Sequence, residues 1–185
     1  MNIPTKAERI EFWKYSYARS SFVHADQFAR RVFSNSPVLE HTLRDAINFG
    51  IVTAYGRPFK QRPEVRLSGD IVPKQHRAVH DELIEMRDKV VAHRDLDGPV
   101  ANWGFISQVQ VFSFGNAIEI HTLSPIISGK MAEKVSSLCV VLIKLMAKKT
   151  EPFLKYLMPP PPKGPHVVSL ENDPAEWLQS AESTK

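Results

Sequence analysis

The stretch "MAEKVSSLCVVLIKLMA" (residues 131–147) decides the fold class of this 185-residue chain. Its apolar residues recur every three or four positions, which is the spacing that places side chains on one face of an α-helix. This apolar stripe consists of Met131, Val135, Leu138, Leu142 and Leu145. The sequence therefore predicts a long closing helix from about residue 128 to 157, and a mainly helical protein around it.

Composition narrows the class of protein further. Hydrophobic residues make up 43% of the chain, which is ordinary for a globular domain. The single cysteine, Cys139, excludes a disulfide framework and a cysteine-rich zinc site, and it is expected to pack as a small hydrophobic residue. A net charge of +4 is too small to argue nucleic-acid binding by itself.

Neither a secretory signal nor a membrane span is expected. The first 22 residues are charged throughout and contain no apolar signal-peptide core. The longest apolar run is interrupted by Lys144 and falls short of the roughly 20 residues that a span requires. We therefore expect a cytoplasmic protein that does not associate with membranes.

Three further helices are expected before the closing one. Thr5 and Glu8 form a capping-box pattern that begins a long first helix, with a break near Ser20–Ser21. Ser36–Pro37 marks the start of a second helix, which ends near Gly56 and is followed by a proline-rich loop. A third helix should run from about residue 73 to 94, on a stripe of Val79, Leu83, Met86 and Val90.

The remaining segments differ in pattern. Alternating apolar residues around Gly115–Asn116 predict a β-hairpin at about 105–123. Four consecutive prolines begin an extended tail, 159–185, in which a short helix near 174–180 would hold Trp177 and Leu178. The fold class is thus mainly α: a four-to-five-helix up-and-down bundle (1–158) with one inserted β-hairpin and an extended Pro-rich C-terminal tail.

The stretch "HDELIEMRDKVVAHRDLDGP" (residues 80–99) carries the candidate chemistry. Positions seven apart lie about 20° apart on an α-helix, so His80 and Arg87 share a face. Arg87 and His93 are six apart and differ by about 120° on a straight helix. They converge only if the helix loosens before Asp95, or if the two side chains come from two chains.

Two interpretations of Arg87 and His93 stay open. In the structural one, His93 is a satisfied histidine near a helix C-terminus, and Arg87 forms a surface ion pair with Asp88 or Glu82. In the functional one, a histidine that exchanges protons near neutral pH helps to deprotonate a ribose 2′-hydroxyl, and an arginine stabilises the phosphate in the transition state. That chemistry is metal-free RNA cleavage, and DNA would be spared.

These residues resemble the motif of the HEPN superfamily, whose members are helical-bundle proteins and include RNases of toxin–antitoxin, abortive-infection and CRISPR systems. The motif is an arginine, four to six residues, then a histidine, and a polar residue commonly follows the arginine. "R-DKVVA-H" fits with Asp88 in the polar place. The phrases "HDELIEMRDKVVAHRD" and "AYGRPF" also resemble bacterial HEPN proteins of the abortive-infection type.

The resemblance implies a homodimer in which two copies of the motif form one composite site. It implies that Arg87 and His93 are catalytic and that Asp88 supports them, with RNA as substrate, no metal or other cofactor, and an antitoxin or regulatory protein as a further partner. From helix face and loop proximity, we add supporting or substrate-binding residues to this site: His80, Asp95, Tyr55 and Arg57. The implied activity is a metal-independent endoribonuclease of a toxin–antitoxin or phage-defence type.

Rival hypotheses remain beside this one. A non-catalytic HEPN-like interaction or nucleotide-binding module would use the same arginine and histidine, and a structural helical protein would recruit a partner through its tail. His76 and His80 have the spacing of a helical metal-binding pair, but no third ligand is obvious. Basic residues of the closing helix form either a strip for RNA backbone or a solvated face: Lys144, Lys148, Lys149 and Lys155.

Overall fold

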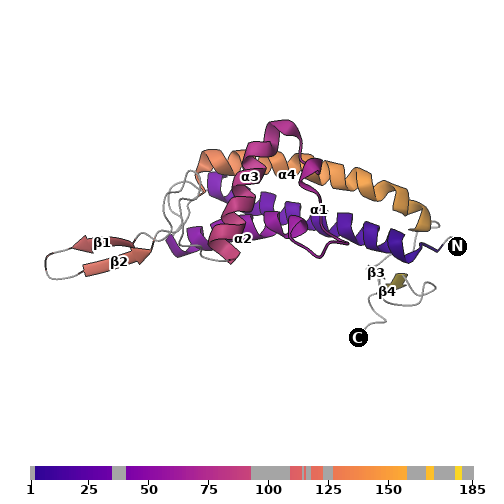
Figure 1. The fold of residues 1–185 in the computed structure, drawn as a ribbon, viewed down its shortest axis with the longest axis horizontal. Coiled ribbons are helices and arrows are strands. Elements are labelled where there is room, and N and C mark those ends of the chain that lie inside the picture. Colours follow the sequence, from indigo (N-terminus) through magenta and orange to yellow (C-terminus); the bar gives the residue numbers. More distant parts are fainter. Residues whose placement is uncertain are drawn as a thin grey trace.

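The computed structural model describes residues 3–34, 41–92, 109–113, 115, 118–122, 127–157, 166–168 and 178–180. Two long helices, α1 (Lys6–Ser34) and α4 (Gly129–Thr150), run side by side along the long axis of the molecule (Figure 1). They are antiparallel, because Ser136 donates to Asp26 at 2.5 Å while Tyr156 reaches back to Glu8 near the start of α1. The expected mainly helical fold is confirmed.

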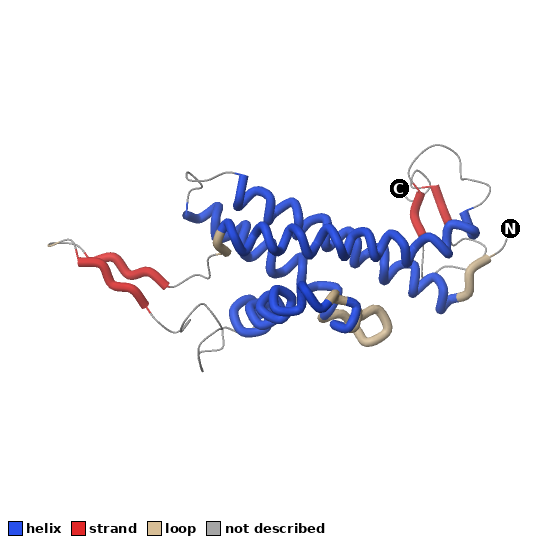
Figure 2. The backbone as a smooth tube through the Cα atoms, turned by 90° about the horizontal axis from the view of Figure 1, so that it is seen from above, coloured by secondary structure: helices blue, strands red, loops and turns tan. Residues whose placement is uncertain are grey.

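Two shorter helices pack on one side of the α1–α4 pair. Helix α2 (His41–Gly56) is followed by a 3-10 turn (Arg57–Phe59) and a loop, and α3 (Arg77–Met86) continues into a π-helical turn (Arg87–Ala92). Figure 2 shows this group as a second layer beneath the long pair. In Figure 1, α3 runs across the direction of α1 and α4, whereas an up-and-down bundle would align it with them. A ten-residue helix that carries its apolar stripe on one face can be buried at such a crossing.

The core lies where the four helices meet. Its fully buried side chains come from every helix and include Phe22, Ile51, Leu83, Leu138 and Leu142. The stripe predicted for the closing helix is inside, with Leu145 at its partly buried edge. Cys139 is also completely buried, and burial raises the pKa of its thiol, so it packs as the small hydrophobic residue that was expected.

Helix α1 is continuous, so the predicted break near Ser20–Ser21 is wrong. Ser21 is buried, and the buried face of α1 consists of small residues around one aromatic: Ala18, Phe22, Ala25 and Ala29. A serine lowers helix propensity by only a few tenths of a kcal/mol, and tertiary packing of this face outweighs it. The predicted capping box is confirmed, because Thr5 N donates to Glu8 Oε2 at 2.9 Å and Glu8 N donates to Thr5 Oγ1 at 3.2 Å.

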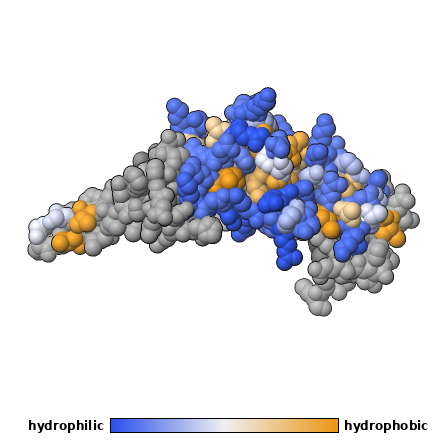
Figure 3. Space-filling view, in the orientation of Figure 1, coloured by the Kyte–Doolittle hydropathy of each residue, from blue (hydrophilic) through white to orange (hydrophobic). Residues whose placement is uncertain are grey.

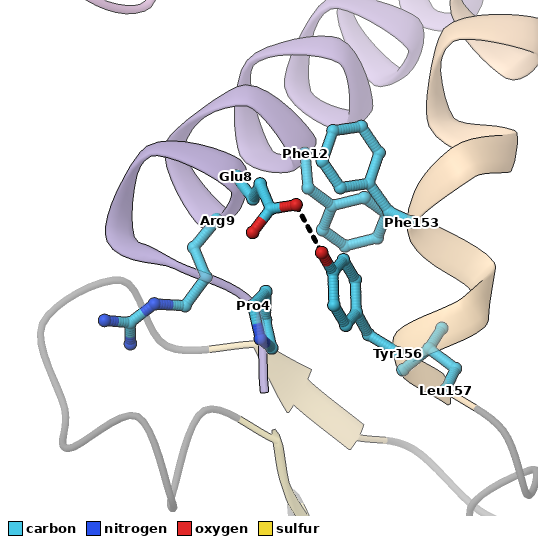
Figure 4. Close-up of a pocket in the computed structure, with 7 residues that line it drawn as sticks. All are labelled: Pro4, Glu8, Arg9, Phe12, Phe153, Tyr156 and Leu157. Carbon is cyan, nitrogen blue, oxygen red and sulfur yellow. Dashed lines mark hydrogen bonds between the residues drawn. The ribbon is translucent and has the colours of Figure 1, made fainter. Parts of the chain in front are cut away.

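The 3-10 helix that follows α4 packs against the start of α1. This helix (Glu151–Leu157) buries Phe153 and Tyr156 against Phe12. Figure 4 shows Tyr156 pointing its hydroxyl at Glu8 across a small cavity. That cavity measures about 10 Å³, close to the smallest space that holds one water, so it offers no room for a ligand.

Short strands lie beyond the helical body. Strand β1 (Val109–Ser113) pairs antiparallel with β2 (Ile118–Thr122), and β3 (His166–Val168) pairs antiparallel with β4 (Leu178–Ser180). The rest of the expected hairpin and most of the tail lie outside the described residues. Leu178–Ser180 is extended, which contradicts a helix there; a helix confined to 174–180 would span only two turns, and helices that short gain too few hydrogen bonds to offset nucleation.

None of the described helices is long and apolar enough to cross a membrane. The residues coloured by hydropathy in Figure 3 are mostly hydrophilic on this face, with hydrophobic ones in scattered patches.

Candidate functional site

The helix that carries the motif changes its hydrogen bonding at the first motif residue. The sequence predicts one α-helix to residue 94, but α3 ends at Met86 and a π-helical turn, Arg87–Ala92, takes over. Single π-helical turns are rare and are frequently found at functional sites. The α-helix expected through this segment is therefore replaced by looser winding at Arg87, before Asp95.

Arg87, Asp88 and Lys60 form one ion-paired cluster. Arg87 Nη1 donates to Asp88 Oδ1 at 3.0 Å, and Lys60 Nζ donates to Asp88 Oδ2 at 2.5 Å. The three side chains are about one-third exposed, at 32%, 37% and 31% in the same order. Two cations share one carboxylate, so the cluster keeps a net positive charge that is accessible from solvent.

The two cations also set the charge state of the carboxylate. Desolvation is the largest influence and would raise the pKa of Asp88. Hydrogen bonds from Lys60 and Arg87, together with their positive charges, outweigh it and hold the pKa of Asp88 below its ordinary value. Asp88 is thus ionised at neutral pH and orients both basic groups.

Gly56, the last residue of α2, provides the space for Arg87. A Cβ added to Gly56 would lie 2.9 Å from Arg87 Cγ and 3.4 Å from Arg87 Cβ. The backbone of Gly56 is ordinary right-handed helix, φ −73° and ψ −25°, so glycine is needed here for close approach and not for its conformation. The neighbouring Arg57 is exposed, and its side chain forms no ion pair within the described part of the chain.

Tyr55 and His80 form a buried pair behind this cluster. Tyr55 Oη lies 2.8 Å from His80 Nδ1, and the two side chains are 0% and 6% exposed. The imidazole packs edge-on against Phe59 at 4.7 Å between ring centroids. Burial is the main reason that the pKa of His80 is lowered, so its neutral form is favoured.

Tyr55 and His80 were each expected to have either a supporting or a substrate-binding role, and their geometry distinguishes the two. Their polar atoms contact each other inside the core, and the Gly69 backbone lies close to the remaining imidazole nitrogen, Nε2. A substrate-binding role therefore does not fit, whereas a supporting role does, because the pair ties the end of α2 to the helix that carries Arg87. The charge state of Asp88 depends on Lys60 and Arg87, and the position of Arg87 depends on Gly56.

The other half of the motif lies outside the described residues. His93 and Asp95 both fall there, so the structure gives no distance between Arg87 and His93. Among the described residues, no group of three or more His, Cys, Asp and Glu could hold a metal ion. His80 is also poorly placed to pair with His76 on a metal, because its side chain is only 6% exposed and packs edge-on against Phe59.

Lys60 and Gly56 are the site residues that sequence analysis missed. Gly56 was interpreted only as a helix end, although the phrase "AYGRPF" had been noted. Lys60 carries no sequence signal, since its partner Asp88 is distant in the chain and the loop between them has no regular period.

Comparisons of the chain with models of protein families, with curated proteins and with solved structures each gave no match. The resemblance to HEPN proteins therefore depends on the motif phrase and the helical fold.

Proposed function

We propose that the protein is a metal-independent endoribonuclease of a toxin–antitoxin or phage-defence type, whose Arg87 and His93 act in a site completed by a second copy of the chain. The observation that carries the proposal is the Lys60–Asp88–Arg87 cluster at the start of the π-helical turn. It presents a partly exposed guanidinium, held by a carboxylate and beside a second cation. Such a group suits a phosphate that gains charge in a transition state.

The reaction follows from the two side chains. His93 accepts the proton of a ribose 2′-hydroxyl, and the resulting oxygen attacks the adjacent phosphorus. The bond from phosphorus to the 5′-oxygen breaks, and that oxygen takes up the proton that the His93 imidazole accepted in the first step. Arg87 stabilises the charge on the non-bridging oxygens, and the products are a 2′,3′-cyclic phosphate and a 5′-hydroxyl.

Cleavage of RNA in EDTA by purified protein tests this proposal. The wild type and Lys89→Ala should cleave, while Arg87→Ala and His93→Ala should not, with fold retention checked by circular dichroism. Lys89 is the matched control because it pairs with Glu85 at 2.8 Å and not with Asp88. The new ends should be 2′,3′-cyclic phosphates by mass spectrometry. Equal cleavage by all four proteins would reject the assignment.

A second candidate is a non-catalytic interaction or nucleotide-binding module. It is favoured by one observation: Arg87 already has an ionic partner in Asp88, as an arginine that stabilises an interface would. In that case the wild type has no nuclease activity to lose. The Arg87→Ala variant would instead shift the dimer towards monomer in sedimentation, or would lose affinity for a nucleotide.

A further inference from the structure

One face of α4 carries four lysines that the candidate site does not use. Taking about 100° per residue, Lys130, Lys134, Lys144 and Lys148 all lie within about 40° of one line along the helix. All four are exposed, while the buried residues of α4 lie on the opposite side and face the core. We name these four residues the α4 lysine stripe.

Two of the four lysines that the sequence suggested for a basic strip, Lys149 and Lys155, do not belong to the α4 lysine stripe. Lys149 leans towards α1, with its Nζ 5.9 Å from the centre of the Tyr15 ring. Lys155 lies over the Tyr156 ring at 4.6 Å and is 4.0 Å from Glu8. These two lysines have partners in the fold, whereas the four of the α4 lysine stripe form no ion pair with any residue that the structure describes.

Two pairs of stripe lysines repel each other along the helix. Lys130 and Lys134 are four residues apart, as are Lys144 and Lys148, and like charges at this spacing destabilise a helix by about 0.2–0.5 kcal/mol per pair. Glu133 and Glu151 lie at the edge of the stripe, about 60° from its line and three residues after Lys130 and Lys148, so each offsets part of this repulsion. A partner that neutralises the lysines would offset this repulsion.

The dimensions and the neighbouring residues indicate the kind of partner. From Lys130 to Lys148 the helix rises about 27 Å, so the charges follow a straight, rigid line. A nucleic-acid backbone offers closely spaced negative charges along such a line. Helices that lie on membranes add large apolar residues to a basic face. Here the residues on the line of the stripe between its two lysine pairs are only Ser137 and Val141, and neither is large.

We propose that the α4 lysine stripe binds the phosphate backbone of RNA, as a surface distinct from Arg87. The choice of RNA among polyanions rests on the proposed function. The stripe holds the strand through charge alone, so it contributes affinity without sequence preference.

Fluorescence anisotropy with a labelled 2′-O-methyl RNA oligonucleotide tests the stripe. This probe lacks the attacking hydroxyl and cannot be cleaved, so the binding result does not depend on nuclease activity. The test variant changes all four stripe lysines to glutamine. The control variant removes the same charge from exposed residues of other elements: Lys6→Gln, Arg19→Gln, Arg31→Gln and Lys74→Gln.

The wild type should bind, and the stripe variant should bind at least about tenfold more weakly at low salt. The slope of log K against log salt should fall by about 3, since each lost phosphate contact with a single strand removes about 0.7. The control variant should keep most of the affinity and slope, and thermal melts should show both variants folded.

Three outcomes would reject the proposal that the stripe binds RNA. They are no RNA binding by the wild type, equal losses of affinity in both variants, and stripe-dependent binding to vesicles containing phosphatidylserine but not to RNA. Cleavage by the wild type with none of the expected binding would reject the RNA-binding role of the stripe but keep the proposed nuclease activity. Stripe-dependent binding without cleavage would reject the nuclease activity but keep the RNA-binding role.

Discussion

Gly56 and Arg87 lie in direct contact: a Cβ placed on Gly56 would be 2.9 Å from Cγ of Arg87. The end of α2 therefore determines where the arginine of the motif can lie, and Asp88 and Lys60 determine where its charge points. The position of Arg87 is consequently a property of three segments of the chain, although the motif belongs to only one.

Replacing Gly56 with alanine should displace the Arg87 side chain without straining the backbone, which is already helical at this position. A displacement of about 1 Å at a reacting group can reduce a rate about 100-fold. We expect RNA cleavage by Gly56→Ala to fall by that order, with a melting temperature close to that of the wild type. Gly129→Ala is the matched control, because a Cβ there meets nothing within 4 Å. Unchanged cleavage by Gly56→Ala would show that the contact does not position Arg87.

Lys60→Gln should raise the pKa of Asp88 towards its ordinary value, because the Lys60 hydrogen bond and charge both lower it. The effect on the free energy of unfolding should stay below about 1 kcal/mol, since the ion pair is about one-third exposed and screened by solvent. NMR titration of the Asp88 carboxyl measures the pKa. Lys89→Gln, which removes a lysine that pairs with Glu85, should leave the Asp88 titration unchanged; an equal shift in that control would point to long-range charge instead.

The Tyr55–His80 pair should make the protein less stable in mild acid. Burial lowers the pKa of His80 in the folded state, so the unfolded state binds more protons as the pH falls below about 6.5. The contribution is fully present above that pH and is lost as the pH falls towards the lowered pKa. Urea unfolding at several pH values should show this slope in the wild type and in His24→Gln, which changes an exposed histidine of α1. The slope should shrink in His80→Phe.

Tyr55→Phe should destabilise the protein by about 1–3 kcal/mol at neutral pH, because it leaves a buried imidazole nitrogen without its partner. Chemical denaturation measures this loss. A value near zero would mean that water or a rearranged neighbour replaces the hydroxyl.

Glu8 links the start of α1 to the 3-10 helix that follows α4, and its pKa reports that link. The hydroxyl of Tyr156 is the largest cause, with Thr5 next, of a pKa lowered from 4.5 to about 2. Stability from Glu8 is present above its unfolded pKa and is lost as the pH falls from about 4.5 to about 2. Tyr156→Phe should raise the pKa of Glu8 in an NMR titration. The control is Tyr15→Phe, because the Tyr15 hydroxyl donates to Glu11 at 3.1 Å and not to Glu8. This variant should leave the pKa of Glu8 unchanged; an equal rise would show that the Tyr156 contact is not the cause.

Local features of the fold could be predicted well from the sequence. The Thr5–Glu8 capping box and the stripes on α3 and α4 depend on residues three or four positions apart, and such neighbours meet in any helix. The break expected at Ser20–Ser21 was wrong for a complementary reason. The propensity of two serines is a weak local signal, and the burial of the alanine-rich face of α1 overrides it.

For the candidate site, the sequence by itself determined which helix carries Arg87 and Asp88, that Arg87 is permanently charged, and that the chain is mainly helical. Only the tertiary structure decided that Lys60 shares Asp88 with Arg87, that Gly56 makes room for Arg87, and that Tyr55 and His80 are buried against each other. The physical reason is that periodicity reports which face a residue occupies on its own helix. Contacts between distant segments depend instead on how the helices pack, and packing is a property of the whole chain at once.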